Sequence, residues 1–178
     1  MSRLVAENIL QQKGENYDYY SQRIHHALES NNYELFKNAL NTLLASIPYD
    51  DFSKAAEQVV TVNNFHFSAQ EWLYRSNILS FLRGCGVVVE AELHTHLGRP
   101  DLVISHKGKV WVIEIKVAYD KQKPQRKALE AYRQIIEKQY AAPYPEAVCI
   151  GLSIDNALRQ ITAIALAPPT KKRKPTLR

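Results

Sequence analysis

Three side chains suited to hydrolytic chemistry lie in a short stretch near the middle of the chain. Asp101 precedes an apolar run, and Glu114 and Lys116 follow it thirteen and fifteen residues later. Between them, two runs rich in β-branched residues flank the dipeptide Lys107-Gly108, a pattern that predicts a β-hairpin. Centred on that turn, the antiparallel register pairs residues whose numbers sum to 215, so Asp101 is expected opposite Glu114.

The hairpin would separate a charged face from an apolar one. Side chains alternate along a strand, so Asp101, Glu114 and Lys116 share one face. The other face collects the apolar residues Leu102, Ile104, Trp111, Ile113 and Ile115. Opposed residues have β-carbons about 5 Å apart, and like charges there destabilise a sheet. A divalent cation would offset the repulsion, hard oxygen ligands favour Mg²⁺ or Mn²⁺ over zinc, and the lysine would hold a water or an anionic oxygen.

A purely structural interpretation of the same residues is also open. Asp101 would end a turn, and Glu114 with Lys116 would form a solvated ion pair on an edge strand. Three valines argue against this structural interpretation: Val103, Val110 and Val112. They lie on the same face as the charged residues, which indicates that part of that face is covered. Charges beside apolar cover are costly unless they are paired or bound to metal, so the functional interpretation is favoured.

Taken together, Pro100-Asp101, the hairpin and Glu114-Ile115-Lys116 resemble the signature of the PD-(D/E)XK nuclease superfamily. The segments 39–49, 71–74, 98–101 and 112–116 resemble, more narrowly, the nuclease-like domain that usually follows an AAA-ATPase-like domain in bacterial proteins. The resemblance runs from about residue 35 to about residue 166. The sequence has no Gly-x-x-x-x-Gly-Lys-Ser/Thr phosphate loop, so we expect any ATPase, or other protein partner, to act in trans.

The resemblance implies an α/β, restriction-endonuclease-like core, in which helices flank a mixed β-sheet, and metal-dependent hydrolysis of phosphodiester bonds, with DNA as the expected substrate. Asp101 and Glu114 would ligate Mg²⁺ or Mn²⁺, and Lys116 would orient or activate the attacking water. Glu71 would add a supporting carboxylate to the metal site. Gln134 resembles a glutamine that supports the site from the corresponding helix.

Two of these assignments have competitors in the sequence. Residues 68–71 read Ser-Ala-Gln-Glu, which is also a capping box, so Glu71 would then serve the helix end alone. Both interpretations stay open. A metal site at His94 and His96 is not favoured, because no third soft ligand lies nearby at a suitable spacing. Tyr140, near Gln134, is expected in the core.

Hydrophobic periodicity predicts the elements that position these residues. Helices are expected at 16–29, 33–47, 68–83 and 124–140, and further strands at 87–89, 147–154 and 160–166. Asn31 and Glu34 are spaced as an N-terminal cap pair for the second helix. The last helix is expected to bury Leu129, Tyr132, Ile135 and Ile136, and the third has Trp72, Leu73, Leu79 and Leu82 among its apolar positions. We expect residues 1–60 to form a helical lead-in packed on a core at 61–167, followed by a flexible basic tail at 168–178.

The net charge of +5 comes from the end of the chain. Five positive residues and no acid lie within residues 171–178, so residues 1–170 are neutral. Local clusters are more informative. We expect Arg99, Lys121, Lys123 and Arg126 to contact phosphates of a nucleic acid. For the lysines and Arg126, the alternative is a solvated helix face. For Arg99, the alternative is an ion pair with Asp101 or Glu92.

The setting inferred from composition is the cytoplasm. Cys85 and Cys149 are the only cysteines and lie in apolar stretches, which does not fit a disulfide framework. The start lacks the apolar core of a signal peptide, and no run reaches transmembrane length, so no membrane partner is expected. The basic cluster 171–174 would act as a nuclear signal in a eukaryotic host, or as a solubilising terminus.

Two other function classes compete with a nuclease. In one, the chain retains the fold without appreciable turnover and binds nucleic acid or a protein; in the other, it is a nuclease-type effector or toxin. The intact Asp101, Glu114 and Lys116 favour the enzyme. The missing phosphate loop and the neutral body favour the binding module. A second copy of the chain, in a homodimer, is a further partner that we consider.

Overall fold

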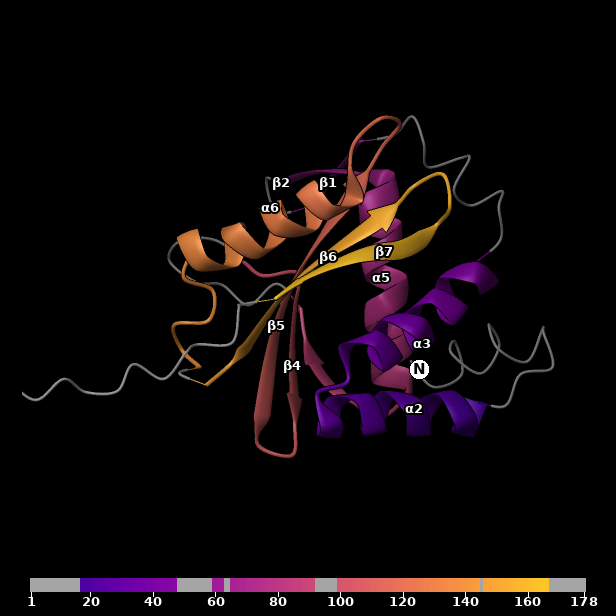
Figure 1. Cartoon of the computed structure of the whole chain (residues 1–178), viewed down its shortest axis with the longest axis vertical. Coiled ribbons are helices and arrows are strands. Elements are labelled where there is room, and N and C mark those ends of the chain that lie inside the picture. The colour runs from indigo at the N-terminus through magenta and orange to yellow at the C-terminus, as the bar shows by residue number, and fades with distance from the viewer. Residues whose placement is uncertain (1–16, 48–58, 63–64, 92–98, 145, 167–178) are drawn as a thin grey trace, which may run out of the picture.

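A mixed sheet of five strands organises the chain (Figure 1). The structure is a computed structural model and describes residues 17–47, 59–62, 65–91, 99–144 and 146–166. The elements, in chain order, are α2 (Tyr17–Ser30), α3 (Tyr33–Ser46), β1 (Val59–Val62), β2 (Phe65–Ser68), α5 (Ala69–Gly84), β3 (Val88–Glu90), β4 (Leu102–His106), β5 (Lys109–Ala118), α6 (Pro124–Glu137), β6 (Val148–Asp155) and β7 (Gln160–Leu166).

The strand order is β3-β4-β5-β6-β7, and β1 pairs with β2 in a separate two-stranded sheet. Only the pair β5 and β6 of the larger sheet is parallel, and α6 makes the crossover that a parallel pair requires. In Figure 1, α6 lies on one side of this sheet and α2, α3 and α5 lie on the other. The expected α/β class, with a restriction-endonuclease-like mixed sheet flanked by helices, is confirmed. None of the described helices is both long enough and apolar enough to span a membrane.

The hairpin of β4 and β5 has the predicted register. Ser105 pairs with Val110 and Leu102 with Ile113, and both pairs sum to 215. Lys107 and Gly108 make the turn with φ of 47° and 78°. Positive φ at both central residues is the requirement of the two-residue turn whose twist matches the strands, and glycine adopts it without steric cost.

The two faces of the hairpin are as expected. Leu102, Ile104 and Trp111 belong to the large core, in which the indole lies 5.3 Å from the rings of both Tyr33 and Phe36, measured between centroids. The opposite face has a smaller cluster under α6, formed by Val103, Val112, Ile135 and Tyr140. The valines beside the charged residues are therefore covered.

The lead-in helices share the large core with the sheet. The buried side chains of α2 and α3 are Ile24, Ala27, Leu28, Phe36, Ala39, Leu40, Leu43 and Leu44, and they belong to one cluster with residues of α5, β4, β5, β6 and β7. The predicted cap of α3 is wrong by one residue. Asn32 is the N-cap, and its Oδ1 accepts a hydrogen bond of 2.9 Å from the Leu35 amide. Asn31 instead has φ of 52°, a left-handed conformation that ends α2.

Leu82 of α5 and Ile135 of α6 are buried as expected, but the rest of the two buried faces differs from the expectation. In α5 the fully buried side chains include Tyr74, Ile78, Phe81 and Leu82, whereas Trp72 is 41% exposed. Helix α6 ends at Glu137, before Tyr140, and its buried residues are Ala128, Ala131 and Ile135. Leu129 and Ile136 are 41% and 51% exposed.

Close approach to the sheet explains the small residues on α6. A β-carbon placed on Gly151 of β6 would lie 2.1 Å from the carbonyl oxygen of Ala128 and 2.5 Å from the amide nitrogen of Tyr132. The helix backbone thus rests almost directly on the strand, where a larger side chain would not fit.

The outer edge of β7 contacts α3. The amide of Ile161 donates to Asn41 Oδ1 at 2.7 Å, and Asn41 Nδ2 donates to the Ile161 carbonyl at 3.1 Å. The side-chain amide thus satisfies both backbone polar groups of that residue.

Candidate active site

Two carboxylates meet at the open end of the β4–β5 hairpin. Asp101 lies just before β4, and Glu114 lies in β5. The amide of Asp101 donates to Glu114 Oε2 at 3.4 Å, and the amide of Ile115 donates to Asp101 Oδ2 at 2.8 Å. The predicted proximity of the two acids is confirmed.

Lys116 and Gln134 converge on the same carboxylate. Lys116 Nζ lies 3.4 Å from Glu114 Oε1, and Gln134 Nε2 donates to that oxygen at 2.5 Å. Gln134 comes from α6, and its Nε2 also lies 3.4 Å from the hydroxyl of Tyr140. Tyr140 is buried in the cluster under α6, as expected of a core residue, and it holds the glutamine in place.

Arg75 is a site residue that the sequence did not single out. Its Nη1 lies 3.2 Å from Asp101 Oδ1, and the two side chains are only 10% and 13% exposed. Residues four apart on a helix lie on the same face, so the helix that directs Glu71 toward the site also directs Arg75 there. The spacing of four residues between Glu71 and Arg75 was therefore the feature of the sequence that could have indicated Arg75 as a site residue.

Glu71 faces the hairpin. Its carboxylate accepts a hydrogen bond from the backbone of Val117. Burial raises the pKa of Glu71 above its ordinary value, the positive charge of Lys116 lowers it, and the negative charge of Asp101 raises it further. These contacts favour a place at the site over a role confined to the helix end.

The charges in the site are strongly coupled. Burial, followed by the charge of Asp101, raises the pKa of Glu114 from 4.5 to about 8, although Lys116 opposes the shift. Burial lowers the pKa of Lys116, but the charges of Glu114 and Asp101 outweigh burial and raise it above its ordinary value. Lys116 therefore stays a cation at neutral pH, which suits orienting a water better than taking its proton.

The donor set fits a hard divalent cation. Three acids (Glu71, Asp101 and Glu114) gather near two cations (Lys116 and Arg75), and burial, together with the charge of Asp101, raises the pKa values of Glu71 and Glu114, so a cation bound among the acids would stabilise their charged forms. Carboxylate oxygens are the ligands that Mg²⁺ prefers. Within the described ranges, no three His, Cys, Asp or Glu side chains lie close enough together to hold an ion by themselves. Asp101 and Glu114 are thus the pair suited to direct ligation, and the predicted third ligand, Glu71, does not complete a cluster with them.

Comparison with known families agrees with this geometry. A family model of the PD-(D/E)XK nuclease superfamily matches residues 69–165, which is 97 of the 178 residues of the chain. The chain belongs to the PD-(D/E)XK nuclease superfamily. No curated protein and no solved structure matches the chain. Membership of this superfamily indicates a nuclease, and the match covers α5, the hairpin and α6 together with all the site residues described above.

The PD-(D/E)XK site adjoins a basic pocket at the start of α6. Lys121, Lys123 and Arg126, which were expected to contact phosphates, line a pocket of about 670 Å³ with Lys127. Glu130, which also lines the pocket, lies one turn before Gln134 on α6, and the positive charge of Lys127 lowers the pKa of Glu71. Arg99 lies two residues before Asp101 and is half-buried.

Some predicted features fall outside the described residues. Glu92, which was considered as a partner of Arg99, lies there together with His94, His96 and the basic tail at 168–178.

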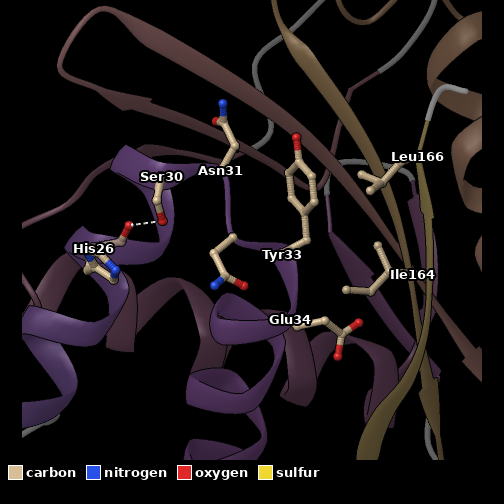
Figure 2. Close-up of a pocket in the computed structure, with 8 residues that line it drawn as sticks. His26, Ser30, Asn31, Tyr33, Glu34, Ile164 and Leu166 are labelled. Atoms are coloured by element: carbon tan, nitrogen blue, oxygen red, sulfur yellow. Dashed lines mark hydrogen bonds between the residues drawn. The ribbon is translucent and has the colours of Figure 1, made fainter. Parts of the chain in front are cut away.

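A second pocket, of about 550 Å³, lies on the other side of the PD-(D/E)XK sheet, at the turn between α2 and α3. In Figure 2, Ile164 and Leu166 reach from β7 toward the ring of Tyr33, and the Ser30 hydroxyl bonds to the carbonyl of His26. None of the residues gathered around Asp101 and Glu114 lines this pocket.

Proposed function

We propose that the chain is a divalent-metal-dependent nuclease that hydrolyses phosphodiester bonds of DNA. The observation that carries the proposal is the convergence of Asp101, Glu114 and Lys116 at the hairpin, with Gln134 bonded to Glu114. An ion pair kept only for stability would have no need of a second acid directly beside the first, because like charges there destabilise the sheet.

Each residue of the site has a definite role in the proposal. Asp101 and Glu114 hold the metal, with Glu71 as a supporting carboxylate, and a bound Mg²⁺ or Mn²⁺ would lower the pKa of a water and neutralise charge on the phosphate. Lys116 orients the attacking water through its ammonium group. Gln134 fixes the rotamer of Glu114, and Tyr140 in turn holds Gln134.

Arg75 has a positioning role. Its guanidinium, 3.2 Å from Asp101, orients that largely buried carboxylate through a charge-assisted contact. The basic pocket beside the carboxylates supports a nucleic acid as the substrate, since its cations would contact phosphates. The choice of DNA, an ATPase partner, a homodimer and a cytoplasmic location stay predictions.

Cleavage of circular, linear and single-stranded DNA with Mg²⁺ or Mn²⁺ tests the proposal. Asp101→Ala and Lys116→Ala should each lower the rate at least about 100-fold, the usual effect of removing a group that stabilises a developing charge. Lys37→Ala, on the opposite side of the sheet, is the matched lysine control and should cleave like the wild type. Circular dichroism of each variant checks that the fold is retained.

Undiminished cleavage by Asp101→Ala or Lys116→Ala would refute the assignment of the site. A wild type that binds DNA equally well with and without metal and never cleaves it would point to the binding module instead.

A further inference from the structure

The basic pocket is a built feature of the loop that joins β5 to α6. Its cations are Lys121, Lys123, Arg126 and Lys127, and its acids are Asp120 and Glu130, so positive charge is in excess. The first turn of α6 has no acidic residue, which leaves the positive end of the helix dipole uncompensated. The pocket therefore favours an anion.

The loop that presents two of these lysines is closed by its own hydrogen bonds. The amide of Gln122 donates to the carbonyl of Tyr119 at 3.0 Å, and the amide of Tyr119 donates to Gln122 Oε1 at 3.1 Å. Between them Asp120 has φ of 49°, a left-handed turn conformation. Lys121 and Lys123 therefore project from a fixed turn, and binding an anion requires little additional ordering of the backbone.

Lys127 connects the pocket to the hydrolytic centre. Its Nζ lies 3.1 Å from Glu130 Oε2, in the wall of the pocket, and Glu130 lies one turn before Gln134 on α6, whose side chain bonds to Glu114. The positive charge of Lys127 also lowers the pKa of Glu71. The pocket also begins at Tyr119, which directly follows the last residue of β5, the strand that carries Lys116. An anion in the pocket would thus lie next to a phosphodiester that is being cleaved.

We propose that this pocket binds the phosphate adjacent to the scissile phosphodiester, and so selects substrates that carry a second phosphate. The inference rests on the proposed nuclease function and deepens it, because it names the part of the substrate that the pocket holds. Successive phosphates of a strand follow every 3.4 Å or so along the axis of a duplex, so a substrate held at the carboxylates brings a neighbouring phosphate within reach.

A binding comparison that needs no turnover tests the inference. Thymidine 3′,5′-bisphosphate carries two phosphates, and thymidine 5′-monophosphate and thymidine 3′-monophosphate each carry one. In titration calorimetry with Mn²⁺, the wild type should bind the bisphosphate about tenfold more tightly than either monophosphate, the gain expected of charge-assisted contacts to one additional phosphate.

The double variant Lys121→Ala/Lys123→Ala should abolish that difference. Both lysines are exposed, so the fold is expected to survive, and circular dichroism checks it. Lys37→Ala lies on α3, on the other side of the sheet, and should keep the tenfold preference.

Equal affinity of the wild type for the bisphosphate and both monophosphates would overturn the inference, as would an unchanged preference in the double variant. The proposed nuclease function fails in a different way, through a wild type that does not cleave DNA with either metal. A preference for the bisphosphate in such an inactive protein would still support the pocket as a phosphate site.

Discussion

Glu114 lies where its charged form is disfavoured. It is buried beside Asp101, and these two factors raise its pKa to about 8. Lys116 and Gln134 both contact the same oxygen of Glu114, but these contacts do not outweigh burial and the charge of Asp101, so the protonated form of Glu114 is still favoured. A bound cation would supply the missing charge, so the stability of the protein should depend on pH and on metal together.

The metal-free protein should lose stability as the pH rises. Between about pH 4.5, where the unfolded carboxyl titrates, and about pH 8, the folded protein holds a proton that the unfolded chain releases. Stability from this group is complete at the acidic end and is lost toward pH 8, by at most about 1.4 kcal/mol per pH unit. Urea unfolding with EDTA, measured from about pH 5 to about pH 8, gives the slope.

Glu114→Gln is the matched variant for that measurement, because it keeps the shape of the side chain and removes the titration. Its slope should be flatter than that of the wild type, and saturating Mn²⁺ should flatten the slope of the wild type. Identical slopes in the two proteins would contradict the assigned origin of the pH dependence.

Glu71→Gln separates a catalytic from a capping role. Glutamine serves the third position of a capping box as well as glutamate does, so the end of α5 should lose nothing. If the carboxylate supports the site, cleavage should fall by about tenfold or more while the thermal midpoint is unchanged. Full activity in this variant would show that Glu71 only caps the helix and does not support the site.

Among elements, α6 depends on Gly151 for its distance from the sheet. A β-carbon there would collide with the backbone at Ala128 and Tyr132, so α6 must shift and carry Gln134 away from Glu114. Gly151→Ala should destabilise the protein by about 1–3 kcal/mol, the usual range for overpacking, and should also lower cleavage. Thermal unfolding and a DNA cleavage assay measure the two effects.

Ser153→Ala is the stability control on the same strand and the same face. The serine is fully buried, and its hydroxyl has no hydrogen-bond partner in the part of the chain that the structure describes. Removing it should therefore leave stability close to that of the wild type or above it. Equal destabilisation by the two alanines would mean that α6 is not seated as closely as the glycine suggests.

The hairpin and its acids were predictable because the information is local. Lys107-Gly108 defines the turn, alternation defines the faces, and the two together determine the register that brings Asp101 to Glu114. Lys116 shares the face of Glu114 by the same alternation, whereas Gln134, which comes from α6, was named only because of the family resemblance.

Features that depend on docking between distant elements were not predictable in the same way. Arg75 reaches Asp101 because α5 packs across the hairpin; the spacing of four residues from Glu71 places Arg75 on the same helix face but does not say that this face meets the hairpin. The alanine face of α6 follows from the approach to Gly151, so apolar size was a misleading guide to burial. The cap of α3 was wrong by one residue because both Asn31 and Asn32 have suitable side chains, and only the backbone conformation distinguishes them.

At the scale of the whole molecule, one core joins the lead-in helices to the sheet. Trp111 of β5 packs against Tyr33 and Phe36 of α3, so the hairpin that carries the acids is buttressed from behind by the N-terminal helices. We therefore infer that the described parts fold as one cooperative unit.

Leu40→Ala tests that cooperativity. Leu40 of α3 is fully buried, and truncation should cost about 2–5 kcal/mol. In a Trp72→Phe background, fluorescence reports on Trp111 alone, and its unfolding midpoint should fall together with that of the circular dichroism signal. Two separate transitions would show that the helices and the sheet unfold independently.

The contact between Asn41 and β7 has a consequence for solubility. An edge strand of a sheet has backbone N–H and C=O groups that can pair with a strand of another molecule, which is a common starting point for aggregation. The carboxamide of Asn41 presents an N–H donor beside a carbonyl acceptor, as a peptide group does, and it fills the hydrogen-bonding positions of Ile161 that another strand would otherwise take. Protection against self-association on this rim thus comes partly from a helix that lies about 120 residues earlier in the sequence.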